Sequence, residues 1–224
     1  MTPVPVMGVD GCRGGWVAVT LGAAITWSWT GLAETAALLD GPADVVAIDI
    51  PIGLPDVGPR ACDRQARARL PGRSACVFPA PRRLVLRASS YGEARAALRA
   101  AGGPSMSAQA WGIVAPVRAV DAAIGPADEA RIVEAHPELA FATMAGSGPL
   151  PPKTSAAGRQ LRRELLTAWR PDAVTALDRS GLPGVDGLDA LACAWVAERW
   201  RRCDATVLGD GARDGRGLLM RIAA

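Results

Sequence analysis

Carboxylates occur at three places in the chain where they could act together. Asp10 ends the apolar run "VMGVD", Asp49 lies inside "VVAIDIPI", and Asp186 and Asp189 belong to "GVDGLDALACAWVAERW". Residues three apart on a helix share a face, so both of the last two can point the same way. Converging carboxylates repel one another unless a cation is present, and hard divalent ions prefer oxygen ligands. The pattern therefore predicts a site for Mg²⁺ or Mn²⁺, and two such ions about 4 Å apart can clamp a phosphodiester.

Each carboxylate also has an ordinary explanation. Asp186 could be a helix N-cap with Asp189 in the first turn, where the helix dipole favours acids. Asp10 could be a turn residue in "VDG". Asp49 is harder to explain in this way, because a carboxylate in an apolar run is costly unless it is paired or coordinated. The three positions together favour catalysis over the separate explanations.

The single histidine lies between two acids in "VEAHPE". On a strand, alternation places Glu134, His136 and Glu138 on one face. Histidine can be a general base or a metal ligand near neutral pH, so we expect Glu134 and His136 to assist catalysis. A structural hydrogen bond between His136 and a neighbouring glutamate is the alternative.

A basic segment covers residues 58–100, where ten arginines face only Asp63 and Glu93. This segment carries a charge of +8, and the rest of the chain carries −5. Such a segment suits a polyanionic ligand, and Arg can grip a phosphate with two hydrogen bonds. Arg60, Arg67 and Arg73 are therefore candidate phosphate contacts. A solvated, salt-bridged surface is an equally good explanation in a chain that uses arginine throughout and has Lys153 as its only lysine.

The glycine-rich stretch "VMGVDGCRGGWVAVTL" could be a phosphate loop or a tight hairpin. A dinucleotide or Walker loop opens a helix, whereas this stretch leads into the strand-like "WVAVTL" and has no GxxxxGK[ST] lysine. We therefore interpret it as a hairpin that presents Asp10, with Arg13 at its tip as a candidate phosphate contact. Trp27 and Trp29 alternate with small polar residues, which indicates a packed strand face rather than a base-stacking platform.

The elements that position these residues follow from hydrophobic patterning. We expect strands within 6–10, 16–22, 24–31, 44–55, 130–137 and 217–223, and helices near 32–41, 60–70, 91–101, 107–124 (interrupted at Pro116), 156–169 and 186–202. This order predicts an α/β fold with a mixed sheet, three antiparallel strands followed by parallel strands, and helices on both faces. Ligands on such sheets bind at the carboxyl ends of the strands.

Length and composition predict a single domain over residues 1–224, with an Arg-rich helical insertion at 55–105. No apolar stretch approaches the roughly 18 residues of a membrane span, and we see no signal peptide. We therefore expect a soluble, cytoplasmic protein with no membrane partner. The five scattered cysteines predict reduced thiols, and one histidine disfavours a zinc site.

Five collinear motifs resemble a known family. They are "GVDGCRGGWVAV", "AIDIPIGLP", "RACDRQARARL" with "VFPAPRR", "VEAHPELAF" and "DGLDALACAWVAER". Together they resemble the domain-of-unknown-function family four-two-nine (DUF429). The resemblance implies an RNase H-like (ribonuclease H-like) nuclease whose acids correspond to Asp10, Asp49 and Asp186 or Asp189, and it places Gln109 in the substrate cleft. The chain departs from the family at Val185, where a further aspartate is usual, and has no lysine in "SAQAWGIVAPVRAVD".

We therefore expect a metal-dependent nuclease or other phosphodiester hydrolase that uses Mg²⁺ or Mn²⁺. Its partner would be a nucleic acid or another phosphodiester substrate. The sequence is also compatible with a homo-oligomer. The main alternative is a non-catalytic nucleic-acid-binding or regulatory module on the same fold. A phosphotransferase of the actin-like type is disfavoured, because that fold needs two such domains. Hydrolysis by Cys12 and His136 is disfavoured as well, because nothing in the sequence places these two residues together.

Overall fold

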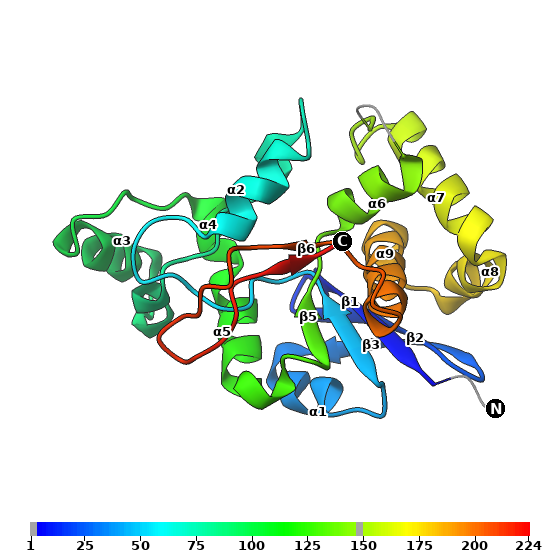
Figure 1. The fold of residues 1–224 in the computed structure, drawn as a ribbon, viewed down its shortest axis with the longest axis horizontal. Coiled ribbons are helices and arrows are strands. Elements are labelled where there is room, and N and C mark those ends of the chain that lie inside the picture. Colours follow the sequence, from blue (N-terminus) through cyan, green and yellow to red (C-terminus); the bar gives the residue numbers. More distant parts are fainter. Residues whose placement is uncertain (1–3, 147–149) are drawn as a thin grey trace.

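The computed structural model describes residues 4–146 and 150–224 and is built around a five-stranded sheet (Figure 1). Its strands lie in the order β3-β2-β1-β4-β5. Their bounds are Val6–Cys12 (β1), Gly15–Leu21 (β2), Ile25–Gly31 (β3), Val45–Ile48 (β4) and Ile132–Glu134 (β5). The first three are antiparallel neighbours, whereas β4 is parallel to β1 and β5 is parallel to β4. The carboxyl ends of β1, β4 and β5 therefore meet at one edge of the sheet.

Helices cover both faces of the sheet (Figure 1). One face of the sheet shares an apolar cluster with four helices: α6 (Pro137–Ala145), α7 (Ala156–Trp169), α8 (Pro171–Ser180) and α9 (Gly184–Arg201). The other face packs against α1 (Thr35–Leu39) and α5 (Val114–Ala123). Alternate residues of β1 and β2 enter the two apolar clusters, so both strands are buried on both sides.

Helix α9 crosses the sheet in close contact with β1. A Cβ atom at Gly8 would collide with the backbone of Ala190 and Ala194 on the helix. Glycine on the strand and alanines on the helix therefore allow the two backbones to approach closely. This contact fixes the position of the first turns of α9 over the carboxyl end of β1.

The segment between β4 and β5 leaves the sheet and returns through α5. It contains α2 (Ala61–Ala68), α3 (Tyr91–Ala100) and α4 (Ala108–Gly112). Short 3-10 turns lie at Leu32–Glu34, Ser74–Cys76, Arg83–Arg87 and Pro126–Asp128. The C-terminal ribbon, β6 (Val207–Leu208) with β7 (Ile222–Ala223), packs against α2 in a separate apolar cluster.

The observed elements confirm the mixed α/β class and correct several boundaries. The strand that begins near residue 44 was expected to end at residues 49–51 and is limited to β4, and the strand expected to end at Pro137 ends at Glu134. Helix 107–124 is divided at Ile113, and Pro116 lies in the first turn of α5, where proline is tolerated. The sequence analysis missed α6, α8 and β6. Pro183 caps α9, so Asp186 lies inside the first turn and is not the N-cap.

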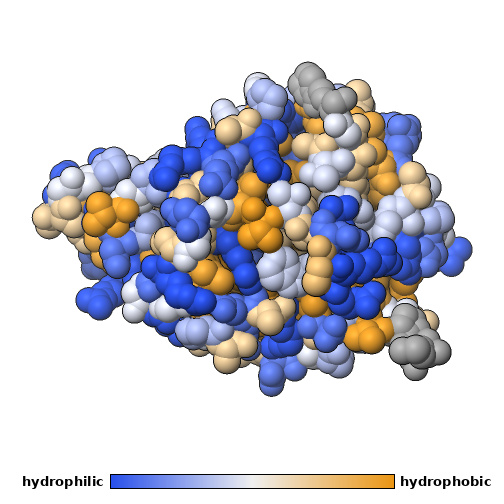
Figure 2. All heavy atoms as spheres, viewed as in Figure 1, coloured by the Kyte–Doolittle hydropathy of each residue, from blue (hydrophilic) through white to orange (hydrophobic). Residues whose placement is uncertain are grey.

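Hydrophobic residues appear as separate patches among hydrophilic ones on the face shown in Figure 2. Among residues 4–146 and 150–224, no helix is long and apolar enough to cross a membrane. All five cysteines are free thiols, as the sequence predicts.

Candidate carboxylate site

Asp10 and Asp49 are neighbours at the carboxyl edge of the sheet. In the parallel pairing of β1 with β4, Val9 lies opposite Ile48, and the Asp49 N–H donates to the Val9 carbonyl at 2.9 Å. The next residue on each strand is therefore an aspartate. Asp10 is only 6% exposed and Asp49 is half-buried.

Helix α9 adds a third carboxylate, because its packing on β1 places Asp189 over the same edge. Asp189 is 2% exposed, and its Oδ2 accepts a hydrogen bond from Lys153 Nζ at 2.7 Å. Asp186, one turn earlier, is half-buried and has only a minor influence on Asp10. Of the two helix acids, Asp189 belongs to the centre of the cluster and Asp186 to its margin.

The pKa values show that the three carboxylates act on one another. Burial raises the pKa of Asp10 well above its usual range, and the charges of Asp49 and Asp189 raise it further. Burial also raises the pKa of Asp49, although His136, Lys153 and a hydrogen bond with Asp10 oppose the rise. Burial raises the pKa of Asp189 to about 6 in spite of Lys153. Burial and the mutual repulsion of these carboxylates therefore favour an added cation.

Lys153 is the cation that the structure places there. Burial acts to lower its pKa, but the Asp189 charge and hydrogen bond, together with Asp10 and Asp49, raise it above the usual value. The side chain remains 45% exposed, so its ammonium reaches the cluster from the solvent side. The sequence analysis noted Lys153 only as the single lysine, because nothing in the local sequence connects it to distant acids.

A cavity of about 470 Å³ opens beside the cluster. The ionisable side chains that line it and bear on the site are Asp49, Arg73, Glu134, His136, Glu138, Lys153 and Asp189. The predicted site residues that do not line it are Asp10, Arg13, Arg60, Arg67, Gln109 and Asp186. Acids and bases from β4, β5, α6, α9 and the insertion therefore meet around one space.

Glu134 is committed to an ion pair within the protein. Both of its oxygens accept hydrogen bonds from Arg60, at 2.6 and 2.7 Å, and Oε2 also accepts from the Ile52 N–H. Arg60 is 2% exposed; its Nε and Nη2 also donate to Asp63, and its Nη1 also donates to the Ile52 carbonyl. This geometry makes Arg60 a structural partner of two acids and leaves it no free donor for a phosphate.

His136 follows β5 and caps α6, where it lines the cavity. Its Nδ1 is buried and has no hydrogen-bond partner among the described residues. Glu138, which was expected on the same strand face, lies instead in the first turn of α6. There it binds Arg162 at 2.7 Å and Arg73 at 3.1 Å. The three side chains do line one cavity, although one of them comes from a helix.

The other predicted phosphate contacts lie farther out. Arg13 is exposed on the β1–β2 hairpin, and Gln109 is exposed on α4. Arg67 is exposed and donates to the Val77 carbonyl. Arg73 alone of the predicted arginines reaches the cavity, where it also contacts Cys76 Sγ at 3.2 Å.

The described residues do not form a ready-made metal site. Among them, no three His, Cys, Asp or Glu side chains stand close enough together to hold a metal ion. The carboxylates form an electrostatically coupled cluster, with Lys153 as its counter-ion.

The fold and the site define a mixed α/β protein with a buried carboxylate cluster at the carboxyl edge of its sheet. The chain belongs to the family described as "Protein of unknown function (DUF429)", whose profile matches residues 8–213. No curated protein and no solved structure matches the chain.

Proposed function

We propose that this protein is a metal-dependent phosphodiester hydrolase, with nucleic acid as its substrate, on an RNase H-like fold. The observation that carries the proposal is the convergence of Asp10, Asp49 and Asp189 from β1, the end of β4 and α9. The antiparallel strands β1–β3 followed by parallel β4 and β5 support the RNase H-like assignment. A structural role alone gives no reason to keep three mutually repelling acids together.

The donor set fits Mg²⁺ or Mn²⁺ in its chemistry. All three side chains offer oxygen ligands. Burial raises the pKa of each, and neighbouring carboxylates add to the rise at Asp10 and Asp189, an effect that a bound cation would offset. Lys153 supplies one charge at Asp189, so a bound ion would require this ammonium to move away. When bound, such an ion would supply charge for the phosphate oxygens and a more acidic water.

The residues around the cavity would bind and orient the phosphodiester. Lys153 and Arg73 carry positive charge into the cavity, where Asp49, Asp63, Glu134, Glu138 and Asp189 are the acidic residues of the lining. The unpartnered Nδ1 of His136 can hold or accept a proton there. Glu134 positions the segment before α2 through its bonds to Ile52 and Arg60.

The test compares wild type with Asp10→Asn and Asp49→Asn. Mn²⁺ binding is measured by calorimetry without substrate, and cleavage is measured on single-stranded and duplex DNA and RNA. We expect both variants to lose Mn²⁺ binding and all Mn²⁺-stimulated cleavage. Asp44→Asn, which changes an exposed carboxylate before β4, is the matched control. Undiminished cleavage by either site variant would refute this site.

A second function is favoured by the ion pair between Lys153 and Asp189. With this ammonium in place, the protein would bind nucleic acid without cleaving it. Binding without cleavage in Mg²⁺, Mn²⁺ and Ca²⁺ alike would support this non-catalytic alternative.

A further inference from the structure

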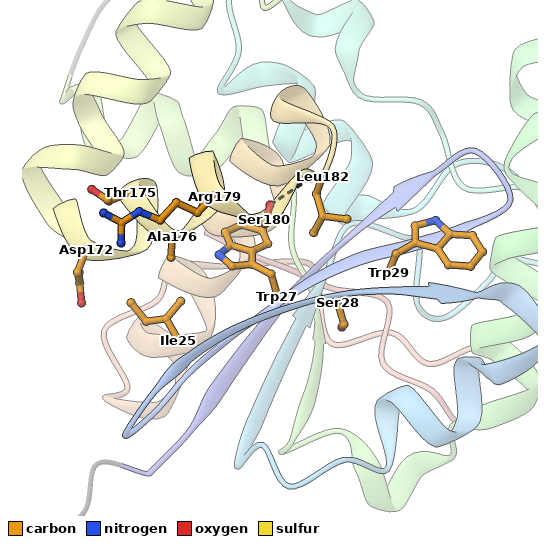
Figure 3. A pocket seen from close by; sticks show the side chains of 10 residues that line it. All are labelled: Ile25, Trp27, Ser28, Trp29, Asp172, Thr175, Ala176, Arg179, Ser180 and Leu182. Carbon is orange, nitrogen blue, oxygen red and sulfur yellow. Dashed lines mark hydrogen bonds between the residues drawn. The ribbon is translucent and has the colours of Figure 1, made fainter.

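Trp29 is an exposed aromatic residue on the edge strand β3. Its side chain is 55% exposed, whereas Trp27 packs partly against the core. The expectation of a packed strand face therefore holds for Trp27 and is wrong for Trp29. Figure 3 shows the two indoles on one side of β3, with Trp27 beside Ser180 and Leu182 and Trp29 farther along the strand.

Two glycines, Gly15 and Gly31, leave room beside the Trp29 ring. A Cβ atom at Gly15 would come within 3.1 Å of the indole, and one at Gly31 within 3.8 Å. The Trp29 side chain also lies near Cys12 at the end of β1, where it opposes the rise that burial causes in the pKa of that thiol. Part of the indole therefore lies next to the backbone at these glycines, and Trp29 as a whole remains exposed.

The ring lies in the same row of the sheet as the carboxylate cluster. Asp10 pairs with Val17, and Val17 pairs with Trp29, so all three point to the α9 face. Two strand spacings of about 4.8 Å place Trp29 about 10 Å from Asp10. Stacked nucleotides are about 3.4 Å apart, so about three nucleotides would cover the distance from Asp10 to Trp29.

A groove of about 670 Å³ continues from Trp29 between β3 and α8 (Figure 3). Its lining includes Trp27, whose buried Nε1 has no hydrogen-bond partner among the described residues. Arg179 brings a positive charge from α8 and makes no ion pair within the part of the chain that the structure describes. Arg13 lies exposed on the hairpin that joins β1 to β2, and β2 is the neighbour of β3. An exposed aromatic ring with cations nearby suits unpaired nucleotides, which offer base faces and phosphates.

We propose that Trp29 is a stacking platform for a base of single-stranded nucleic acid, whose strand runs from the carboxylate cluster along the groove to Arg179. This inference names the substrate class for the proposed function and rests on it. Duplex DNA or RNA would bind less well, because its bases are already stacked and paired.

The test measures the binding of a short fluorescent oligothymidylate in EDTA, so that neither metal nor cleavage is needed. Trp29→Leu, which keeps apolar bulk but removes the aromatic face, is compared with Trp29→Phe. Loss of one stacked base corresponds to about 1–3 kcal/mol, or an affinity about 5- to 150-fold lower. We expect this loss in Trp29→Leu and a clear recovery in Trp29→Phe. An oligomer of abasic sugar phosphates should bind wild type and Trp29→Leu equally.

Equal binding of oligothymidylate by wild type and Trp29→Leu would overturn the platform. It would also be overturned if Trp29→Leu lost as much affinity for the abasic oligomer as for oligothymidylate. A preference for duplex over single strand would overturn it as well. The proposed function can fail independently of the platform. In that case the wild-type protein would neither bind Mn²⁺ nor cleave nucleic acid, but it would still bind oligothymidylate through Trp29.

Discussion

Asp10 lowers the stability of the fold at neutral pH, because its charge is buried beside two other acids. A raised folded-state pKa means that the folded protein keeps a proton that the unfolded chain releases, so stability falls as pH rises above about 4. We therefore expect Asp10→Asn to raise the Tm at pH 8, by about 2–4 °C for each kcal/mol gained. The gain should shrink towards pH 4. Thermal melts without divalent cations test this, and a lower Tm at pH 8 would contradict it.

Arg60, in contrast to Asp10, stabilises the fold, because its charge neutralises Glu134 and Asp63 in the interior. Arg60→Met would leave both acids without their partner. Breaking a buried ion pair in this way costs about 3–5 kcal/mol. Urea unfolding should show this loss, whereas Arg64→Met, an exposed change on α2 just after Arg60, should leave the midpoint nearly unchanged. A midpoint for Arg60→Met as high as that of the control would exclude a stabilising role.

At the scale of elements, the contact between β1 and α9 positions Asp189 over Asp10. Gly8→Ala would push α9 away from the strand, because the new Cβ meets helix backbone that cannot rotate aside. We expect a loss of about 1–3 kcal/mol from overpacking, together with weaker coupling between the two acids. Gly184→Ala, at the open start of the same helix, should be neutral or stabilising. Chemical denaturation of both variants provides the measurement, and equal stabilities would contradict the close contact.

The sequence predicted the elements whose patterns are local and strong. Strands β1–β3 and helix α7 follow directly from apolar periodicity and turn glycines. The sequence also predicted that Asp10 and Asp49 could act together, and the pairing of β1 with β4 makes them neighbours. Helix α6 was missed because its nine residues are mainly buried and lack a polar face. The ion pairs of Arg60 and Lys153 join residues 74 and 36 positions apart, so no local pattern reveals them.

At the scale of the whole molecule, the C-terminal ribbon holds the insertion against the sheet. Leu208, Ile222 and Ala224 are buried against residues of α2, and Asp214 accepts a hydrogen bond from the Leu54 N–H at 2.9 Å. Removing residues 206–224 would expose this cluster. We expect faster hydrogen exchange in α2 and a lower Tm, with smaller changes in β1 and β2. Unchanged protection of α2 would contradict this role of the ribbon.

The basic segment illustrates why net charge alone could not locate a binding surface. Arg60, Arg73 and Arg83 use their charges on acids of the protein itself. Much of the +8 of residues 58–100 is therefore internal neutralisation, while Trp29 and Arg179 lie outside that segment altogether.

The ion pair of Lys153 has a consequence for labelling chemistry. Lys153 carries the only ε-amine in the chain, and its contact with Asp189 keeps it protonated and slow to react with acylating reagents. Any cation that displaces it from the carboxylates would make it a faster nucleophile. The rate at which this one side chain is acetylated, followed by peptide mass spectrometry, therefore reports directly on whether the acidic cluster is occupied.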